Sequence, residues 1–587
     1  MNRFFKFPHN SNAGVLAIVF GIGVFGYLLN TTQWLTMIPG DLGDPRFNSV
    51  ILEHLYQWTT DATQRLWHPQ FFYPFEWVLG FSDNHFGSAW SYVALRLLGL
   101  AREEAYLGWF LCGSVLSFWG CWFALTKLEF SSLGAALGAF VFAFGLPVLH
   151  QESHAQLVYR FAIPLAVLAW YRVLTVRDTS SLIQTIFWCS LQFLCSIYLG
   201  IFLAYLLLAM LIAYWACTLL PVVLNDSKIT EKKPKNEVSR RWWGHRWFAS
   251  WSLTTVVYVL CVVGVLMLAL VMLRRYELVF YLYSFERPLD VVASMLPRLG
   301  SYLLADHSEL SGWIGRGLTH IPARVEQQMF VGVGVCCIAL IGAILTLQSR
   351  NSEGLNLEIR QLVRLSILAL LFLVICTLFV FEGSLYLMLA ESVPGIRAVR
   401  VVSRIILVMM MPVAVLVAAG VDALVKFFGL RLHPLLLASL LVMFVTTESV
   451  YYQPDHTLIQ SWRDRRDQLA GRIGSVLEKD AILFVTSPPG QDFFMAEIDA
   501  MIYAQDHKHP TFNGYSGNYP PGYTYLNPCT RAQNRINGYL DFVAARGRNP
   551  PHDGQSLLQR LHVVELGPCI DPNLYSADGL PKGPQKK

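Results

Sequence analysis

Pro39-Gly40-Asp41-Leu42-Gly43-Asp44-Pro45-Arg46-Phe47-Asn48 is an acidic, glycine-punctuated stretch that directly follows the first long apolar segment, residues 14–36. Carboxylates held at a membrane surface are candidates for chemistry. An Asp-x-x-Asp beside Gly and Pro is also a common turn, in which the carboxylates cap backbone amides. Which reading holds for Asp41 and Asp44 depends on what the rest of the chain places around them.

The composition of the whole chain is that of a polytopic membrane protein. Of its 587 residues, 54% are hydrophobic and 14% are charged, against about 25% charged residues in soluble domains. The formal net charge is +5, and the basic residues lie in separate clusters. This distribution gives no reason to expect a nucleic-acid partner.

Apolar runs long enough to cross a bilayer, roughly 17 to 25 residues, predict an α-helical protein with about eleven transmembrane helices. The runs are residues 14–36, 105–126, 132–149, 157–174, 180–197, 199–224, 251–273, 329–348, 365–381, 404–425 and 433–450. A further apolar stretch, residues 86–101, is of marginal length and is interrupted by Arg96. We expect it to form a helix on or in the outer leaflet, with a twelfth span as the alternative.

Basic residues mark alternate gaps between these runs, beginning with Arg3 and Lys6 before the first. By the positive-inside rule the N-terminus is cytoplasmic, and an odd number of spans places residues 451–587 outside. The predicted organisation has two parts. A multi-spanning membrane domain, residues 1–450, carries outer loops at 37–104 and 274–328, and an extracytoplasmic C-terminal domain, residues 451–587, follows it.

The C-terminal domain is expected to be small and of mixed α/β type. It begins with an amphipathic stretch, residues 458–477, which is followed by a strand-like segment at residues 481–485. Cys529 and Cys569 can pair if this domain faces an oxidising compartment, and two unpaired thiols are the alternative.

Acidic residues and imidazoles gather in the first outer loop. After Asp41 and Asp44, the candidates for substrate binding are Glu53, His54, Asp83 and His85. A carboxylate near an apolar interface has its pKa raised by desolvation, which suits a general base, and two close carboxylates suit a divalent cation. A divalent cation is therefore a candidate cofactor, but no complete ligand set can be read from the sequence.

The gap between the third and fourth runs adds His150, Glu152 and His154, and Arg160 begins the next run. If this gap is helical, the two histidines are i, i+4 neighbours, a spacing that can hold a metal. The alternative is a set of polar residues that line an interface and bond each other. For Arg160 we expect contact with a phosphate.

A basic group precedes a late run, with Arg397, Arg400 and Arg404 on one face if the segment is helical. Three guanidinium groups on the outer side run against the positive-inside trend. Binding of an anionic group such as a phosphate explains them, and interfacial snorkelling is the alternative.

Four motifs together resemble one class of membrane enzyme. They are Gly40 to Asn48, His150 to Gln156, Pro394 to Arg404, and Asn513-Gly514-Tyr515-Ser516-Gly517-Asn518-Tyr519-Pro520-Pro521. With these, nearly the whole chain resembles the GT-C class of integral-membrane glycosyltransferases, and more narrowly a bacterial family with this motif layout. The resemblance implies a GT-C-like fold in the bacterial inner membrane, surrounded by membrane lipids. It also implies an inverting enzyme that moves a sugar from a polyprenyl-phosphate carrier to a glycan, lipid or protein acceptor of the cell envelope, on the outer side.

The same resemblance implies roles for individual residues. Asp41, with Asp44 beside it, would be the catalytic carboxylate that deprotonates or orients the acceptor. Arg160, Arg397 and Arg400 would neutralise the leaving phosphate, and Tyr515 would pack or meet an acceptor sugar. Four aromatic residues would line the polyprenyl groove or anchor the protein at the interface: Trp67, Phe71, Phe72 and Tyr73.

Two other classes share many of these features. A flippase would also show many spans and basic outer clusters, but ion-coupled carriers usually keep ionisable groups near the midplane. Several runs here, including residues 251–273 and 329–348, contain no Asp, Glu, Lys, Arg or His. A non-catalytic scaffold of the same fold is the third alternative.

Overall fold

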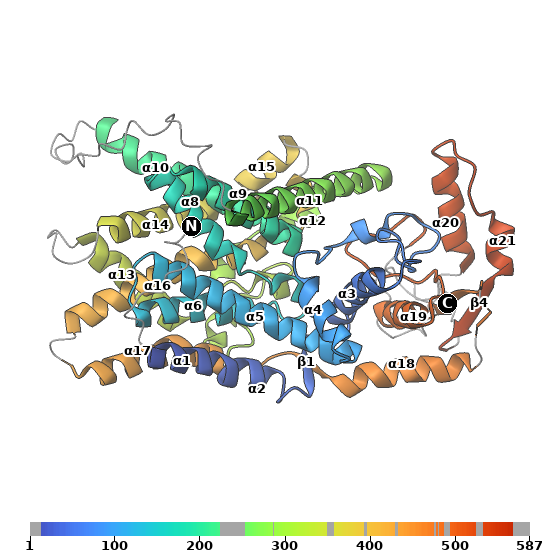
Figure 1. Ribbon diagram of the computed structural model, residues 1–587, viewed down its shortest axis with the longest axis horizontal. Helices are drawn as coiled ribbons and strands as arrows, with labels where there is room; N and C mark the ends of the chain where they lie inside the picture. Colours follow the sequence, from blue (N-terminus) through green and yellow to red (C-terminus); the bar gives the residue numbers. More distant parts are fainter. Residues whose placement is uncertain are drawn as a thin grey trace, which may run out of the picture.

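The computed structural model shows an elongated, mostly helical molecule, with apolar helices at one end and the C-terminal elements at the other (Figure 1). It describes residues 13–223, 253–285, 287–348, 357–392, 396–428, 432–474, 477–478, 480–486, 493–523 and 532–567. The predicted fold class, an α-helical polytopic membrane protein, is confirmed.

Eight helical segments among the described residues are long and apolar enough to cross a membrane, and each coincides with a predicted span. They are α1, η1 and α2 (Ala13–Gly21, Ile22–Leu28, Leu29–Thr31), α5 (Arg102–Lys127), α6 and α7 (Ser132–Phe144, Leu146–Leu149), η3 and α8 (Ala155–Leu157, Ala162–Thr175), α10 (Ile197–Val223), α11 (Leu253–Tyr283), α14 (Leu357–Thr377), and η9 and α16 (Val402–Ile405, Ile406–Phe428).

The other three predicted spans are shorter helices. They are α9 (Thr179–Cys195), α13 (Val333–Gln348) and α17 (Pro434–Val450), of 17, 16 and 17 residues, of which α13 and α17 are strongly apolar. At about 1.5 Å per residue they reach roughly 25 Å, slightly less than a hydrocarbon core of about 30 Å. The count of eleven crossings therefore stays a prediction.

Helix α16 lies at the centre of the helical bundle, packed between α6 and α13. Small residues allow this close approach, because a Cβ added to Gly342 would lie 2.5 Å from the Cα of Gly420. Close backbone packing of this kind is a main source of helix association inside a membrane. The centre of the bundle is thus a rigid frame for the loops at its end.

The apolar stretch 86–101 contains only a nine-residue helix, α4 (Ala89–Leu97). At about 1.5 Å per residue it is roughly 14 Å long, too short to cross a bilayer. A twelfth span is therefore excluded, and the placement of α4 at the outer leaflet stays a prediction. The remaining short helices are η2 (Val78–Phe81), α12 (Leu289–Ser294), η5 (Leu299–Leu303), η6 (Gly312–Gly315), η7 (Arg324–Gln327), α15 (Leu385–Ser392) and η8 (Ile396–Ala398).

A small antiparallel pair joins the loop after the first apolar helix to the start of the C-terminal region. Strand β1 (Met37–Pro39) pairs with β2 (His456–Leu458), with Ile38 opposite Thr457. Directly after β1, the amide of Gly40 donates to the carbonyl of Asp455. Helix α3 (Asp44–Thr60) then begins with Pro45 in its first turn, a favoured position because proline lacks the amide proton that would stay unpaired there.

The C-terminal elements match the two that were predicted. Helix α18 (Ile459–Ile473) is the amphipathic stretch, and β3 (Ile482–Thr486) is the strand, which pairs in parallel with β4 (Leu561–Glu565). Three more helices complete this region: α19 (Phe493–His507), α20 (Ala532–Ala544) and α21 (Gly554–Gln559). Cys529 and Cys569 lie outside the described residues, and the domain boundary near residue 450 stays a prediction.

The aromatic residues expected along a lipid groove or at the interface include two that lie in a core instead. Phe71 is 3% exposed, and Phe72 is fully buried against Tyr519 and Tyr523. This core joins the loop after the first apolar helix to the C-terminal region, so these two rings are not free to contact lipid. The expectation was wrong for Phe71 and Phe72 because sequence alone did not show the covering elements.

Candidate active site

Asp41 lies exposed in the turn between β1 and α3. Its Oδ1 accepts a hydrogen bond from the amide of Gly43, at 2.9 Å. The turn interpretation of the sequence is thus correct for this one oxygen, while the carboxylate as a whole stays open to solvent. Partial desolvation of the carboxylate raises the pKa of Asp41 above 3.8. The hydrogen bond from the amide of Gly43 opposes this rise, and the nearby charge of Asp44 adds to it.

Asp44 is the first member of a chain of polar contacts beside Asp41. Its Oδ1 accepts from the hydroxyl of Tyr515 at 2.6 Å, and its Oδ2 lies 3.0 Å from Nδ1 of His154. The other ring nitrogen of His154 is 3.0 Å from Oε1 of Glu326. Arg404 holds Glu326 in turn through Nε at 3.1 Å and Nη2 at 2.8 Å. Five side chains therefore form one continuous network.

The charges of this network follow from the contacts. Burial and Arg404 oppose protonation of His154, but Glu326 and Asp44 outweigh them and raise its pKa to about 9. Burial raises the pKa of Asp44, but its bonds to His154 and Tyr515 bring it below 3.8. The pKa of Glu326 is likewise held well below its ordinary value, against burial, by Arg404 and His154. At neutral pH the network is two carboxylates, one imidazolium and one guanidinium.

Distant parts of the chain meet in this network. Asp44 begins α3, His154 lies between α7 and η3, Glu326 lies in η7, Arg404 in η9, and Tyr515 follows α19. These positions follow the first, third, seventh, ninth and eleventh apolar helices. Segments that meet at one membrane face must be separated by even numbers of crossings, so the network favours a crossing by each of the shorter helices α9, α13 and α17.

His85 supports the start of α3 through Asn48. The ring of His85 bonds Oδ1 of Asn48 at 2.9 Å, and Nδ2 of Asn48 donates to the carbonyl of Asp44 and to Oε1 of Gln156. Burial lowers the pKa of His85 to about 3, so its ring is neutral. His85 therefore positions the first turn of α3.

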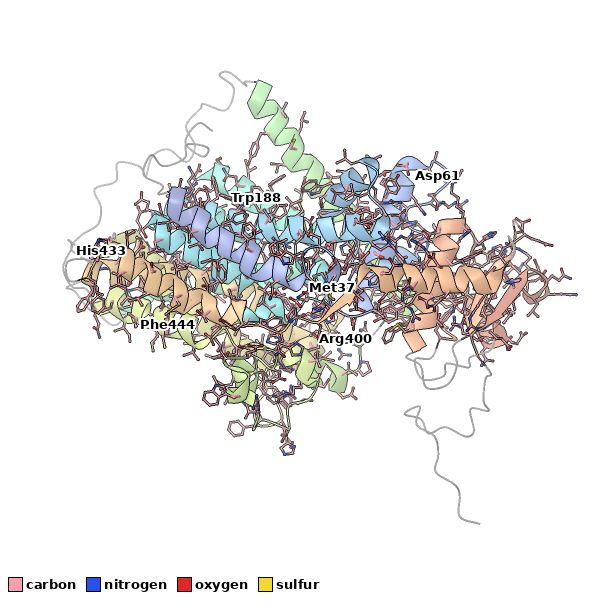
Figure 2. The ribbon with its side chains drawn as sticks, turned by 90° about the horizontal axis from the view of Figure 1, so that it is seen from below. Met37, Asp61, Trp188, Arg400, His433 and Phe444 are labelled. Atoms are coloured by element: carbon pink, nitrogen blue, oxygen red, sulfur yellow. The ribbon has the colours of Figure 1, made fainter. Side chains whose placement is uncertain are left out.

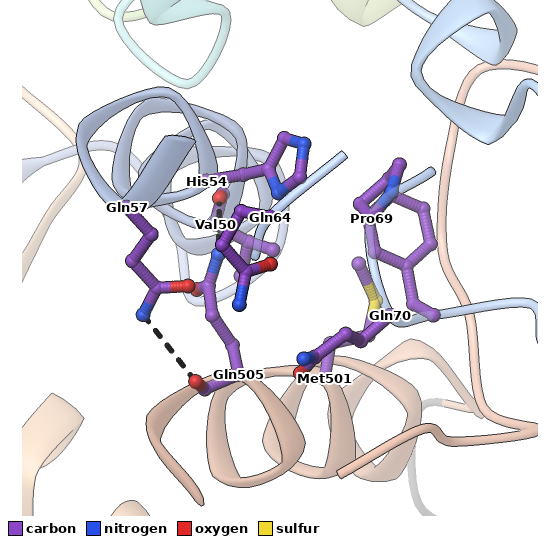
Figure 3. A pocket seen from close by; sticks show the side chains of 9 residues that line it. Val50, His54, Gln57, Gln64, Pro69, Gln70, Met501 and Gln505 are labelled. Atoms are coloured by element: carbon purple, nitrogen blue, oxygen red, sulfur yellow. Dashed lines mark hydrogen bonds between the residues drawn. The ribbon is translucent and has the colours of Figure 1, made fainter. Parts of the chain in front are cut away.

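Two predicted residues on α3 face a different neighbourhood. Glu53 accepts from Arg96 at 2.9 and 3.0 Å and from the hydroxyl of Tyr92 at 2.6 Å. His54 bonds the carbonyl of Leu66 at 2.9 Å and lines a pocket rich in glutamine amides (Figure 3). Neither joins the network around Asp44.

Two more predicted residues have local contacts, and a third is buried. Asp83 accepts from the hydroxyl of Ser196 at 2.9 Å and from the amide of Ile197 at 2.8 Å, where α10 begins. His150 packs edge-on against His307 and Tyr452, and Glu152 is 4% exposed. The helical pairing of His150 with His154 was wrong, because residues 150–154 form turns that turn the two rings toward different partners.

The three late arginines do not share one helical face. Residues 396–398 and 402–405 form separate 3-10 turns with a non-helical stretch between them, so the prediction of a common face was wrong. Nε of Arg397 donates to the carbonyl of Ala390, while Arg400 is half-buried at the boundary between the bundle and the C-terminal region (Figure 2). Arg160 is 1% exposed and donates to backbone carbonyls, including that of Leu157.

Glu326 is the one network member that the sequence analysis missed. It lies in a predicted outer loop, but no repeat, motif or periodicity singles it out. The only available signal was its negative charge, in a loop predicted to lie on the same side of the membrane as the basic motif of residues 394–404. A contact across 172 positions with His154 cannot be read from such a signal.

Within the described residues, no group of three or more His, Cys, Asp or Glu side chains is arranged to hold a metal ion. At the candidate site, the two oxygens of Asp44 are taken by Tyr515 and His154. Each of these oxygens can accept a further contact, but a divalent cation placed there would lie close to the imidazolium of His154 and be repelled by it. The side chains present therefore fit a divalent cation poorly.

Fold and site together define a polytopic α-helical membrane protein with a carboxylate-centred charge network at one end of its helical bundle. No family model matches the chain, and no curated protein matches its sequence.

Distant likenesses exist among solved structures. The oligosaccharyltransferase of Archaeoglobus fulgidus in its apo form is 12% identical over 88% of this chain, with a TM-score of 0.41, and the chain spans 65% of that enzyme's length. ArnT from Cupriavidus metallidurans is similar at 12% identity in its apo state, over 85% of each chain, with a TM-score of 0.30. Its form bound to undecaprenyl phosphate is similar at 11% identity, over 85% of this chain and 86% of that one, with a TM-score of 0.31.

The charge network predicts a two-limbed pH profile for any activity of this site. Activity should fall as pH rises through about 9, because His154 then loses the proton that joins Asp44 to Glu326. The same proton stabilises the folded protein fully below pH 6.5, its ordinary pKa, and that stabilisation is lost through about pH 9. On the acid side, activity should fall at a pH above 3.8, where Asp41 becomes protonated.

The measurement is a pH–rate profile of the wild type and of His154→Gln. Glutamine cannot titrate, so the variant should lose the limb near pH 9 while it keeps the acid limb. An alkaline limb that persists unchanged in the variant would show that another group titrates there.

Proposed function

We propose that the protein is a GT-C-type glycosyltransferase of the bacterial inner membrane. It moves a sugar from a polyprenyl-phosphate carrier to an acceptor of the cell envelope, on the outer side. The observation that carries the proposal is the open carboxylate of Asp41 beside the half-buried charge network of Asp44, His154, Glu326 and Arg404. The sequence motifs that contain these residues, except Glu326, are those of the resemblance described above.

In this proposal Asp41 is the general base. The acceptor nucleophile attacks the anomeric carbon, and its proton passes to the Asp41 carboxylate. The bond from that carbon to the carrier phosphate breaks, and the phosphate leaves with the electron pair. The displacement inverts the anomeric centre and needs no covalent intermediate on the enzyme. A positioned base with a raised pKa suits proton removal near neutral pH, a contribution of about 10²–10⁴-fold to rate.

Asp44 differs from Asp41 in this scheme because both of its oxygens are engaged. The imidazolium of His154 and the hydroxyl of Tyr515 keep it ionised. It therefore acts by holding the first turn of α3, which directly follows Asp41, and the network behind it resists displacement. Fixed geometry of this kind lowers the barrier because reacting groups need not be ordered during the reaction.

Arg400 is the best-placed candidate to meet the carrier phosphate. Arg404 is bound to Glu326 and Arg397 to a backbone carbonyl, while Arg400 is held through its backbone amide, which donates to the hydroxyl of Tyr198 at 3.3 Å. No side-chain hydrogen bond of Arg400 to the described residues is seen. A guanidinium group at this boundary can neutralise a leaving phosphate. The side chain of Arg160 is buried and donates to backbone carbonyls, which does not favour phosphate contact, and its role stays a prediction.

The test is a transfer assay with the purified protein in sealed proteoliposomes. A panel of polyprenyl-phosphate sugars, labelled in the sugar, is supplied with a cell-envelope extract as acceptor. The proposal predicts that label moves from the lipid fraction to the acceptor fraction. Label that crosses the bilayer while still attached to its carrier would establish transport instead, and label that stays in place for every donor would favour a scaffold.

Tyr515→Phe should lower the rate of transfer by about 10- to 100-fold. The change removes the hydroxyl that donates to Asp44 at 2.6 Å, and a hydrogen bond to a charged group contributes about 1.5–3 kcal/mol. The measurement is the initial rate of transfer at saturating donor. Tyr451→Phe, which removes the hydroxyl of an exposed tyrosine, is the matched control, and equal rates for the two variants would contradict a role for Tyr515.

A further inference from the structure

The loop that carries Tyr515 is held by an ion pair that lies behind it. Oε2 of Glu497, on α19, accepts from the amide of Gly514 at 2.7 Å and from Nδ2 of Asn513 at 3.1 Å. Nη1 of Arg535, on α20, donates to the same oxygen at 3.0 Å, and its Nη2 donates to Oε1. The two side chains are 12% and 8% exposed, so one carboxylate is shared by the loop and by a buried guanidinium.

Asn513 fixes the other side of this loop. Its Oδ1 accepts from the amide of Val485 at 2.7 Å, and its Nδ2 donates to the carbonyl of Val485 at 2.9 Å. The loop therefore continues the edge of strand β3 through a side chain. At Gly514 the ring of Phe72 fills the space that a Cβ would need, which explains glycine at this position. The backbone before Tyr515 has little freedom while Glu497 is in place.

The same helix also contacts α3 close to Asp44, the partner of Tyr515. Two residues beyond Glu497, the carboxylate of Asp499 is bonded to Arg46, which is two residues beyond Asp44. Residues two apart on a helix face different sides, so Glu497 reaches the loop of Tyr515 while Asp499 reaches α3. Helix α19 thus contacts both segments that carry the hydrogen bond between Tyr515 and Asp44, the loop of Tyr515 and the first turn of α3.

We infer that Glu497, with Arg535, is a positioning residue that sets the hydroxyl of Tyr515 on the carboxylate of Asp44. Arg535 is itself oriented between the rings of Phe484 and Tyr523, at 4.9 and 4.5 Å from their centroids. A guanidinium bonded to both oxygens of a carboxylate is directional, so the pair fixes the orientation as well as the position of Glu497. The consequence for catalysis rests on the proposed function, whereas the consequence for the loop does not.

The first readout is hydrogen exchange of the loop in the full-length protein. Glu497→Gln keeps the size of the side chain but removes the charge that Arg535, Gly514 and Asn513 share. Backbone exchange in residues 511–517 should rise about 10- to 100-fold, the scale expected for local opening after loss of charge-assisted hydrogen bonds. Exchange in α18 and in the bundle helices should not change. Asp541→Asn, an exposed carboxylate on α20, is the matched control and should leave residues 511–517 unaffected.

The second readout is transfer activity in a double-mutant comparison. If Glu497 acts through Tyr515, Glu497→Gln should lower the rate by no more than Tyr515→Phe, and the double variant should be no slower than Tyr515→Phe alone. Arg535→Lys keeps the charge but not the two parallel hydrogen bonds. Backbone exchange in residues 511–517 should therefore rise less in this variant than in Glu497→Gln.

The outcomes separate the positioning role of Glu497 from the proposed transferase function. Unchanged exchange in residues 511–517 of Glu497→Gln would overturn the inference, as would a rise spread over the whole C-terminal region, which would show a merely structural role. Fully additive losses of rate would also overturn it. The expected exchange pattern in a protein that transfers no sugar would support the positioning of Tyr515 and refute the proposed function.

Discussion

Replacing Asp41 by asparagine is expected to lower kcat for sugar transfer by about 10²–10⁴-fold, the contribution of a positioned general base. KM for the donor should stay nearly unchanged, because the lost interaction is made only as the acceptor proton moves. Asparagine retains Oδ1, which accepts from the amide of Gly43 at 2.9 Å. The turn before α3 should therefore keep its geometry, and the loss can be assigned to chemistry.

The matched control for this change is Asp61→Asn in the same loop. Asp61 pairs with Lys508 at 2.7 Å at the far end of α3, and the lysine is 62% exposed. An exposed pair of this kind contributes only about 0–1 kcal/mol, so the control should retain full activity. Transfer by Asp41→Asn at the rate of the control would remove Asp41 from the mechanism.

Replacing Arg404 by methionine is expected to abolish transfer and to destabilise the protein by about 3–5 kcal/mol, the usual effect of removing one partner from a buried ion pair. Arg404 and Glu326 are 6% and 14% exposed, and Arg404 makes two hydrogen bonds to Glu326. Without Arg404, Glu326 keeps only His154 as a charged partner. The measurement is the free energy of unfolding in detergent micelles together with the rate of transfer.

Two variants give this experiment its controls. Arg463→Met breaks a pair with Glu104 in which the side chains are 32% and 38% exposed. It also removes a 3.8 Å contact with Glu103, which keeps its pair with Arg466, so the change should cost no more than about 1 kcal/mol. The double variant Glu326→Gln with Arg404→Met should recover part of the lost stability, since it also removes the carboxylate that has lost its guanidinium partner. A single Arg404→Met variant that is as stable as Arg463→Met would contradict the network.

The membrane architecture was readable from the sequence because lipid imposes long apolar helices. Every predicted span coincides with a helix, including the shorter α9, α13 and α17. The grouping of Asp44, His154, Arg404 and Tyr515 at one end was also predictable, from motifs that fall in alternate gaps of the chain. These features depend on the apolar composition of each run and on whether an odd or even number of runs separates two motifs. Both can be read directly from the sequence.

The detailed contacts were not predictable because they depend on irregular backbone. Glu326 reaches His154 from a single 3-10 turn, and the late arginines lose a common face because residues 399–401 are not helical. Phe72 is covered by Tyr519 and Tyr523, from the C-terminal region more than 440 positions away. No periodicity records contacts of this length.

The most direct test of the central claim is the release of free polyprenyl phosphate by the wild type and by Asp41→Asn, side by side, from a panel of polyprenyl-phosphate sugars with acceptor present. A transferase centred on Asp41 should release one carrier phosphate for each sugar transferred, with almost none from the variant. Equal release by both proteins would refute the role of Asp41. Absence of release from every donor would refute transfer from a polyprenyl phosphate.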